Sequence, residues 1–484
     1  EIHERLVGSE MCIRDRSRFL WGTLSAISRQ GINFVATIVL SRLLLPSDYG
    51  IIGMMAIVIS VSEIIIDAGL GGAIVKKKTV KSIDLATLTT YNIVVSLLLY
   101  VAIYFLAPLL ADLYNVEALI FLLRIYALTI VIESFSIVPK VLVLKNLMLK
   151  QYALTNLISG VLGLVVAIIL AFCGLGVYSL IYQYIISAMI YGVLIYKFSG
   201  YRISIGFSCC SFKELFIFGV NTTSANILRS ISENIYNNIV AKVASLNIAG
   251  YYSQSYKLQG VVGSVQNSII DSVLFPILCK EKGSLFERAR NLNNIVTFIF
   301  TNLCFLLMLN SKEIIIILLG DNWVGMDLFL KPLFLVGIIQ AFTSLYRNTL
   351  KSLGKTFDIF KVEIWAFIIA IPFYIYLFKS KRIEYIVCLF LCYSIIRMYI
   401  SICYLSTNFN IPRKSIFLDL IKQFLIPLPV YVVFSFANFF LEFGAIIRLC
   451  LMTSFYLFSV IGLYECFHVE VYRKIKEQVI NFMK

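Results

Sequence analysis

Two arginines, Arg29 and Arg229, lie inside long apolar segments in which charged residues are rare. A charge near the centre of a bilayer costs about 2.5 to 3.5 kcal/mol on insertion scales, so a functional reason for keeping it is the first to consider. A guanidinium group in such surroundings could bind an anion. Because the two arginines lie 200 residues apart in corresponding segments, we expect them to act on one anionic group together.

Polar side chains recur at helical spacing around these arginines. Steps of three and four residues place one set on a single helix face that cannot face lipid: Thr222, Asn226, Arg229, Glu233 and Asn237. Other apolar segments add Asn33, Ser60, Glu63, Lys257, Ser264 and Asn267. We expect these faces to line one central cavity, and we expect its ligand contacts to come from Arg29, Asn33, Asn226, Arg229, Asn237 and Lys257.

The acidic residues in these segments allow two interpretations. Glu63 and Glu233 lie deepest in their segments, where a carboxylate in a low dielectric could exchange a proton. In the structural alternative, Arg29 pairs with Glu63 or Asp67, and Arg229 pairs with Glu233, so that the ion pairs lock helices together. Six further charged positions inside apolar segments are expected to be mainly structural: Arg124, Glu133, Arg397, Asp419, Lys422 and Arg448.

The chain contains an internal repeat. At an offset of 200 residues, Ile27 coincides with Ile227, Arg29 with Arg229, Arg42 with Lys242 and Gly50 with Gly250. At an offset of 204, Asp67 coincides with Asp271 and Lys76 with Lys280; the extra residues amount to about one helical turn. Asp67 and Asp271 precede basic loops by nine residues, so we expect them to be gate or cap residues rather than ligands.

Composition places the chain in a membrane, since 60% of its residues are hydrophobic, 14% are charged and the mean hydropathy is +0.89. The net charge of +15 lacks the long basic tract expected of a nucleic-acid-binding protein. Runs of about 20 apolar residues predict an all-α, polytopic protein with about fourteen spans, near 19–42, 50–75, 85–110, 118–139, 152–173, 177–197, 215–242, 250–279, 293–310, 327–346, 360–378, 385–405, 416–441 and 444–464.

Basic residues separate the two membrane sides. Alternate loops and the C-terminal tail carry 23 lysines and arginines, whereas the opposite loops carry four, three of them between Lys379 and Arg382. The positive-inside rule then predicts that both termini are cytoplasmic. Because six spans separate the two repeat copies, both copies point the same way, which indicates a parallel duplication.

This duplication predicts the domain organisation. An N-lobe of six spans covers 17–210 and a second lobe of six spans covers 211–405. Two further spans at 406–464 form an appendage, and 465–484 form a cytoplasmic tail. An amphipathic interfacial helix is expected in the tail, with apolar positions at Val471, Ile475, Val479 and Met483.

The first residues need separate treatment. Arg5 to Arg16 (RLVGSEMCIRDR) resembles the translation of a sequencing adapter, so we expect 1–16 not to belong to the natural protein. Without them, His468 is the single histidine and ten cysteines remain, with no Cys-x-x-Cys pair. We therefore expect no metal site, no disulfide framework and no cofactor.

Several stretches resemble the oligosaccharide and polysaccharide flippases of the multidrug/oligosaccharidyl-lipid/polysaccharide exporter superfamily. They are SRLLLPSDYGIIGM (41–54), DAGLGGAIVKKK (67–78), APLLADLY (107–114), GLGVYSLIYQ (174–183) and AGYYSQSYKL (249–258). Their order and spacing carry the resemblance, which covers the first 280 residues; the remainder matches in hydropathy and in the turn from Gly320 to Trp323.

The resemblance implies a MATE-like fold and a carrier for undecaprenyl-diphosphate-linked oligosaccharides in the bacterial inner membrane, serving O-antigen, capsule or exopolysaccharide synthesis. The cavity cations would bind the diphosphate, and Glu63 and Glu233 would couple transport to an ion. Implied partners are membrane lipid, a polysaccharide polymerase and chain-length machinery, with no nucleic acid. Alternatives are a multidrug or metabolite antiporter, a flippase for peptidoglycan precursors, and, less favoured, a membrane polymerase or ligase; no enzyme activity is expected.

Overall fold

The computed structural model describes residues 30–269, 285–352, 355–380, 382, 384–409, 413–440 and 443–483. Within these ranges the chain is helical and contains no β-strand. The prediction of an all-α, polytopic membrane protein is confirmed. Residues 1–16, assigned to an adapter, lie outside the described residues.

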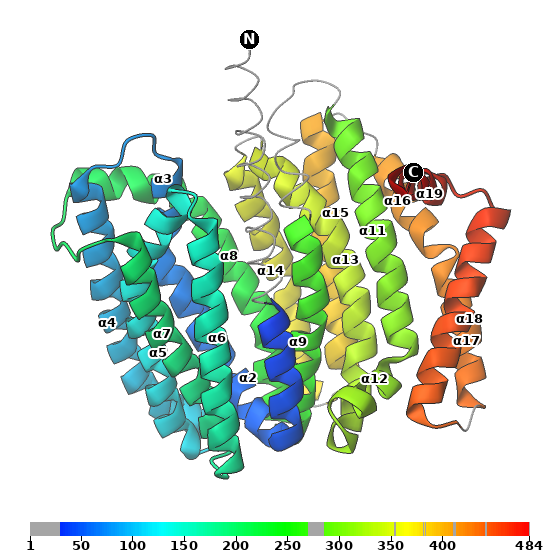
Figure 1. The fold of residues 1–484 in the computed structure, drawn as a ribbon, viewed down its shortest axis with the longest axis horizontal. Helices are drawn as coiled ribbons and strands as arrows, with labels where there is room; N and C mark the ends of the chain where they lie inside the picture. The colour runs from blue at the N-terminus through cyan, green and yellow to red at the C-terminus, as the bar shows by residue number, and fades with distance from the viewer. Residues whose placement is uncertain are drawn as a thin grey trace. The chain divides into compact units, whose positions relative to one another are not determined.

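The first compact unit comprises residues 1–250. Its described part begins with a helix over 30–43. It continues with α2 (Pro46–Asp67), α3 (Leu70–Lys76), α4 (Ser82–Tyr114), α5 (Ala118–Lys145), α6 (Leu149–Phe172), α7 (Val177–Ser199) and α8 (Cys209–Val243). Helices α4 to α7 run side by side (Figure 1), with α5 packed between α4 and α7.

One predicted span of this unit is divided. Helix α2 ends at Asp67 because Ala68 and Gly69 both adopt the left-handed conformation, with φ of 43° and 69°. A second reason favours glycine at position 69. A Cβ there would lie 2.9 Å from the Cα of Gly219 on α8, which is too close for a side chain. The short helix α3 then packs into an apolar cluster made of Ala68, Leu70, Ala73, Ile74, Leu88, Val138, Val141 and Leu215.

The second compact unit comprises residues 251–484. Helix α9 (Leu246–Ile269) begins in the first unit and continues here. The following helices are α11 (Leu285–Leu309), α12 (Ser311–Leu318), a 3₁₀ helix η2 (Asp321–Met326), α13 (Asp327–Ser352), α14 (Thr356–Ser380), α15 (Glu384–Phe409), α16 (Arg413–Phe424), α17 (Pro427–Phe439), α18 (Ala445–Cys466) and α19 (Glu470–Met483). Thus the predicted repeat boundary at 210 differs from the contact boundary at 250, because α8 packs against α2, α3 and α4.

Two spans of the second unit are also broken. Helices α11 and α12 form a pair bent by 72°, which accounts for the apolar stretch after Leu309. The span predicted at 416–441 is two helices, α16 and α17, because Pro427 lacks the N–H that a continuous helix would need.

Ten helical segments in the described part are long and apolar enough to cross a membrane, and the bent pair α11–α12 makes up to eleven. The other three predicted spans correspond to the helix over 30–43 and to α8 and α9. Of these, α8 and α9 are much less apolar than their neighbours, and the first and eighth predicted spans extend beyond the described residues. The sequence therefore located the helices correctly, while their boundaries shift by several residues.

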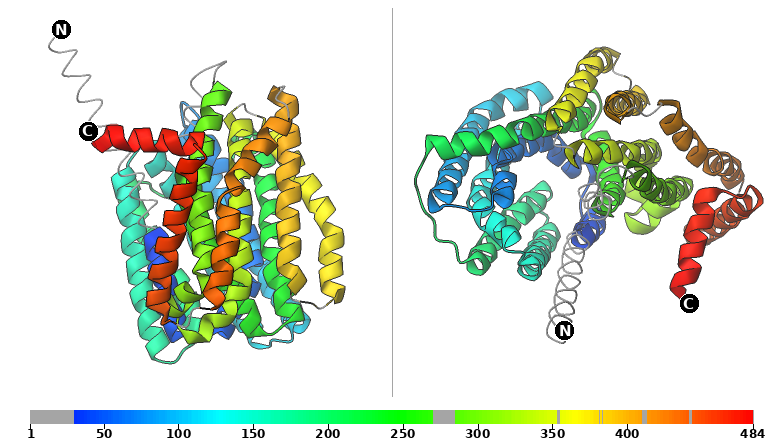
Figure 2. Two further views of the ribbon diagram at one scale, coloured as in Figure 1. Left: turned by 90° about the vertical axis from the view of Figure 1, so that its right-hand side faces the viewer. Right: turned by 90° about the horizontal axis from the view of Figure 1, so that it is seen from above.

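Helix α19 forms the tail predicted as amphipathic. Figure 2 shows it lying across the end of α18 instead of continuing it. Val471 and Ile475 are half-buried, whereas Arg473 and Lys474 between them are exposed. Such a helix is suited to a membrane interface, with its apolar side inward and its charges in water.

Candidate substrate-translocation site

Helix α8 carries the polar stripe that the sequence predicted. It packs along α2, where the hydroxyls of Ser60 and Ser230 are 2.9 Å apart. At its far end, the hydroxyl of Tyr114 donates to Oδ1 of Asn238 at 2.6 Å. Polar side chains on a membrane helix are unfavourable against lipid but favourable against polar groups of neighbouring helices. The packing of α8 against α2 and α4 therefore explains why this helix can be polar.

Arg229 is held by a carboxylate of its own helix. Its Nε lies 2.8 Å from Oε1 of Glu233, one turn along α8, and both side chains are largely shielded from solvent. The pair predicted between these residues therefore exists, and this bond is formed within one helix.

A second group of charges comes from α2 and α5. Glu63, Glu133 and Lys140 are all solvent-exposed although they lie inside membrane-spanning helices. Glu63 interacts electrostatically with both Glu133 and Lys140. Exposed charges that face one another across two spanning helices indicate a hydrated face of the first unit.

Sequence reasoning missed this grouping. The sequence predicts a mainly structural role for Glu133 and does not connect it with Lys140. In the structure, α5 continues to Lys145, so both residues are helical. A usable signal was present, because a spacing of seven residues puts Glu133 and Lys140 on one helix face.

The remaining predicted residues of the first unit fall into three situations. Asn33, Asp67 and Asn226 are exposed, in keeping with a hydrated face. Asn237 is buried, 4% exposed, and its Oδ1 has no hydrogen-bond partner among the described residues. Arg29 lies outside the described residues, so the predicted cooperation of Arg29 with Arg229 stays a prediction.

Where α3 meets α8, a polar cluster holds the two helices together. Nζ of Lys77 lies 2.9 Å from Glu214 and 3.1 Å from Asp84, and the hydroxyl of Ser211 donates to Asp84. The bond to Glu214, aided by Asp84, raises the pKa of Lys77 above its ordinary value. Lys145 donates to the carbonyl oxygen of Ile74 at 2.9 Å and so closes the end of α3.

Two of the motifs that carried the resemblance meet in space. The carboxylate of Asp48 accepts hydrogen bonds from the N–H groups of Leu45 and Val177. Gly176, which has a φ of 53°, brings the turn before α7 close enough that a Cβ would lie 3.4 Å from Asp48. Asp48 thus caps α2 and fixes the α6–α7 turn.

In the second unit, the AGYY and Gly320–Trp323 motifs also pack together. The hydroxyl of Tyr251 donates to the carbonyl oxygen of Asn322 at 3.0 Å, and its ring meets buried Trp323 edge-on at 6.1 Å. A Cβ on Gly325 would lie 2.6 Å from that ring, which explains the glycine there.

Two arginines within helices of the second unit form ion pairs with glutamates. Nη2 of Arg397 lies 2.9 Å from Oε1 of Glu363, with side chains only 9% and 5% exposed, so the structural role expected for Arg397 agrees with its position. Arg448 lies 3.4 Å from Glu313. Lys257, predicted to contact substrate, is half-buried on α9. Asp271 lies outside the described residues.

Over the described ranges, no three histidine, cysteine or acidic side chains come together as metal ligands. The cysteines in these ranges are free thiols.

Comparisons with known proteins identify the family. The profile described as "Polysaccharide biosynthesis protein" matches residues 39–327, so the chain belongs to this family. It is 25% identical over 306 residues to the succinoglycan biosynthesis transport protein ExoT of Rhizobium meliloti (strain 1021), covering 63% of this chain and 62% of that one. It is 22% identical over 357 residues to the lipopolysaccharide biosynthesis protein WzxC of Escherichia coli (strain K12), covering 73% of each.

Among solved structures, the fold matches that of the lipid II flippase MurJ in an inward closed conformation. The TM-score is 0.69 at 14% sequence identity, over 93% of this chain and 99% of MurJ. The similarity in fold covers nearly all of both chains, including the helices beyond the family match. The chain is therefore a multi-pass membrane protein whose fold is similar to that of MurJ.

Proposed function

We propose that this protein translocates oligosaccharides linked to a lipid diphosphate across the bacterial inner membrane by alternating access. The family match supports a role in polysaccharide biosynthesis, and the alignment with ExoT, named as a transport protein, supports transport instead of catalysis. Because that alignment spans 62% of ExoT, its function is extended to this chain as a proposal.

The observation that carries the proposal is the hydrated, charged face of the first unit. Glu63 and Glu133 are exposed on helices whose other faces are strongly apolar. Arg229 and Asn226 lie on α8, which packs against α2. A sugar needs amide and carboxylate partners, and a diphosphate needs guanidinium or ammonium groups in a low dielectric; this face supplies both.

With both termini in the cytoplasm, as the basic residues indicate, the start of α2 lies at the extracytoplasmic side. At that side the first turns of α2 and α9 touch, with Gly50 against Leu246 and Gly250 against Pro46. Backbone contact there leaves no passage between these two helices.

The remaining parts of the proposal follow from the repeat. The lobes at 17–210 and 211–405 would rock about the cavity, and the helices at 406–464 would be an appendage. A polysaccharide polymerase and chain-length machinery would receive the translocated units. Arg29, Arg229 and Lys257 would bind the diphosphate.

The test is complementation in cells lacking the chromosomal copy of this gene. The proposal requires that surface glycan disappears, that lipid-linked repeat units accumulate on the cytoplasmic side, and that the gene restores export. Loss of peptidoglycan synthesis instead would assign the protein to peptidoglycan precursors, and altered drug resistance with normal glycan would assign it to multidrug export. Unchanged lipid-linked sugars would contradict the proposal.

A further inference from the structure

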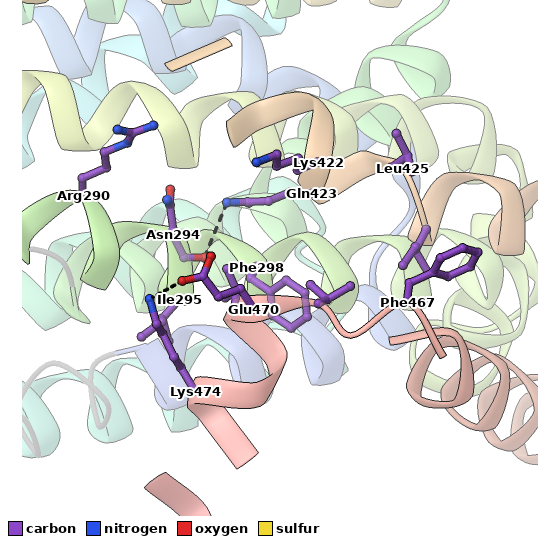
Figure 3. Close-up of a pocket in the computed structure, with 13 residues that line it drawn as sticks. Arg290, Asn294, Ile295, Phe298, Lys422, Gln423, Leu425, Phe467, Glu470 and Lys474 are labelled. Carbon is purple, nitrogen blue, oxygen red and sulfur yellow. Dashed lines mark hydrogen bonds and ion pairs between the residues drawn. The ribbon is translucent and has the colours of Figure 1, made fainter. Parts of the chain in front are cut away.

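A cavity of about 660 Å³ lies in the second unit, outside the face described above (Figure 3). Helix α11, the end of α16 and the turn from α18 into α19 form its walls. This volume is in the range of small-molecule sites in proteins. The proposed transport cavity does not use any of these helices for its charged residues.

The lining of this cavity has an excess of positive charge. Arg290, Lys422 and Lys474 come from three different helices, and Glu470 is the one carboxylate among the described residues that line the cavity. Glu470 lies 3.0 Å from Nζ of Lys474, a bond that lowers the pKa of Glu470 and keeps it ionised. Three cations around one carboxylate leave the site suited to an anion.

A buried amide adds a second requirement. Gln423 lines the cavity and is only 5% exposed. Its Nε2 donates to the carbonyl oxygen of Asn294 at 3.5 Å, while its Oε1 is buried without a hydrogen-bond partner among the described residues. A buried acceptor left unpaired is unfavourable by about 1 to 3 kcal/mol, so a hydroxyl on the occupant would be stabilising here.

The rest of the lining is apolar and continues onto the outer surface. Ile295, Phe298 and Ile426 form the inner part of the cavity. Leu425 and Phe467 also line it, and they are 65% and 70% exposed. Leu425 lies just before α17 begins, and Phe467 lies between the end of α18 and the start of the amphipathic helix α19. The boundary between apolar spans and an amphipathic helix is the level expected for lipid headgroups. A free phosphate or a nucleotide would leave this apolar part in contact with water.

We propose that this cavity binds an anionic glycerophospholipid of the surrounding membrane, with its phosphate among Arg290, Lys422 and Lys474 and a headgroup hydroxyl at Gln423. The acyl chains leave the cavity past Leu425 and Phe467. The second unit alone forms this site, and none of the described residues proposed to bind substrate line it. We therefore assign it to a structural or regulatory lipid, and its existence does not depend on the proposed transport function.

The experiment measures binding of phosphatidylglycerol to the delipidated full-length protein in detergent, by native mass spectrometry. Phosphatidylcholine and inorganic phosphate are the comparison probes. We expect phosphatidylglycerol to bind and the two comparison probes to bind far more weakly. The double variant Lys422→Gln/Lys474→Gln should bind phosphatidylglycerol at least about tenfold more weakly. Lys414→Gln, an exposed cation at the start of α16 outside the cavity, should bind it normally.

A second variant is expected to increase lipid binding, so its result cannot be explained by misfolding. The side chain of Glu470 is 82% exposed, so Glu470→Gln should leave folding unaffected. Because this change removes a negative charge beside the cations, phosphatidylglycerol should bind more tightly. Equal binding by wild type and the double lysine variant would overturn the proposal. Phosphatidylcholine bound as tightly as phosphatidylglycerol would also overturn it, and so would inorganic phosphate bound as tightly as the lipid, which would indicate a site for free phosphate.

Discussion

Gly50 and Gly250 are equivalent residues of the internal repeat, and their backbones meet where α2 and α9 begin. A Cβ on Gly50 would lie 2.2 Å from the carbonyl oxygen of Leu246, and a Cβ on Gly250 would lie 1.8 Å from that of Pro46. Pro46 and Leu246 are themselves 200 residues apart, so the contact is reciprocal. The 200-residue offset of the repeat therefore relates these two backbone contacts to each other.

This close approach predicts that Gly250→Ala and Gly50→Ala open the contact. Each added methyl overlaps backbone oxygen, which cannot move as a side chain can, and overpacking of this kind costs about 1 to 3 kcal/mol. We expect a lower thermal unfolding temperature in detergent and reduced surface glycan in cells. Gly260→Ala on the same helix, where no atom lies within 4 Å of the new Cβ, is the control and should behave as wild type.

The arginines of the repeat are expected to be indispensable. Arg29→Ala or Arg229→Ala should abolish surface glycan at normal protein level, because each removes a cation that the diphosphate needs in a low dielectric. Glycan blotting and membrane immunoblotting measure the two quantities. Arg202→Ala, an exposed arginine between α7 and α8, is the matched control. Wild-type glycan in a double Arg29→Ala/Arg229→Ala variant would rule out this role.

The acidic residues test ion coupling. A carboxylate on a hydrated face inside the membrane can take up and release a proton during a transport cycle. We therefore expect Glu63→Gln and Glu233→Gln to bind substrate but to lose uphill transport into vesicles driven by an ion gradient. Because Glu63 interacts with Glu133, the variant Glu133→Gln should change the same dependence. Full gradient dependence in the Glu63→Gln/Glu233→Gln protein would show that coupling occurs elsewhere.

The buried pair of Arg397 and Glu363 should stabilise the second unit as long as both partners are present. Arg397→Met takes the partner at 2.9 Å away from the buried carboxylate of Glu363, so we expect a loss of up to about 3 to 5 kcal/mol of stability. The double variant Arg397→Met/Glu363→Leu removes both charges and should recover most of that loss. Unfolding in a denaturant series measures the three proteins, and a double variant as unstable as the single one would contradict the interpretation.

The cluster around Lys77 predicts a pH dependence of stability at high pH. Its pKa is raised above the ordinary value of 10.5, first by the bond to Glu214. A raised pKa means that the contribution is complete below 10.5 and is lost as the pH rises through the higher value of the folded state. Thermal unfolding followed across this window should show less loss in Glu214→Gln than in wild type. The effect is small because Glu214 is 62% exposed.

Sequence alone located nearly every membrane helix, because a span must be long and apolar whatever surrounds it. The spacing of residues along the chain also predicts the polar face of α8 and the internal repeat in which Gly50 corresponds to Gly250. The motifs that contain Asp48 (41–54) and Gly176 (174–183) can be recognised in the sequence, but the sequence does not predict that they contact each other. Hydropathy depends on each segment and the bilayer alone, which is why these features can be read from the chain.

Tertiary structure decided which faces meet. Glu63 finds Glu133 and Lys140 only because α2 and α5 turn those faces toward each other, a matter of packing between helices far apart in the chain. Whether Arg229 would lie beside Glu233 also depended on the folded helix, and the geometry of α8 brings the two side chains to 2.8 Å. The cavity between α11, α16 and α19 has no signature in the sequence, since its cations come from three segments that only folding brings together.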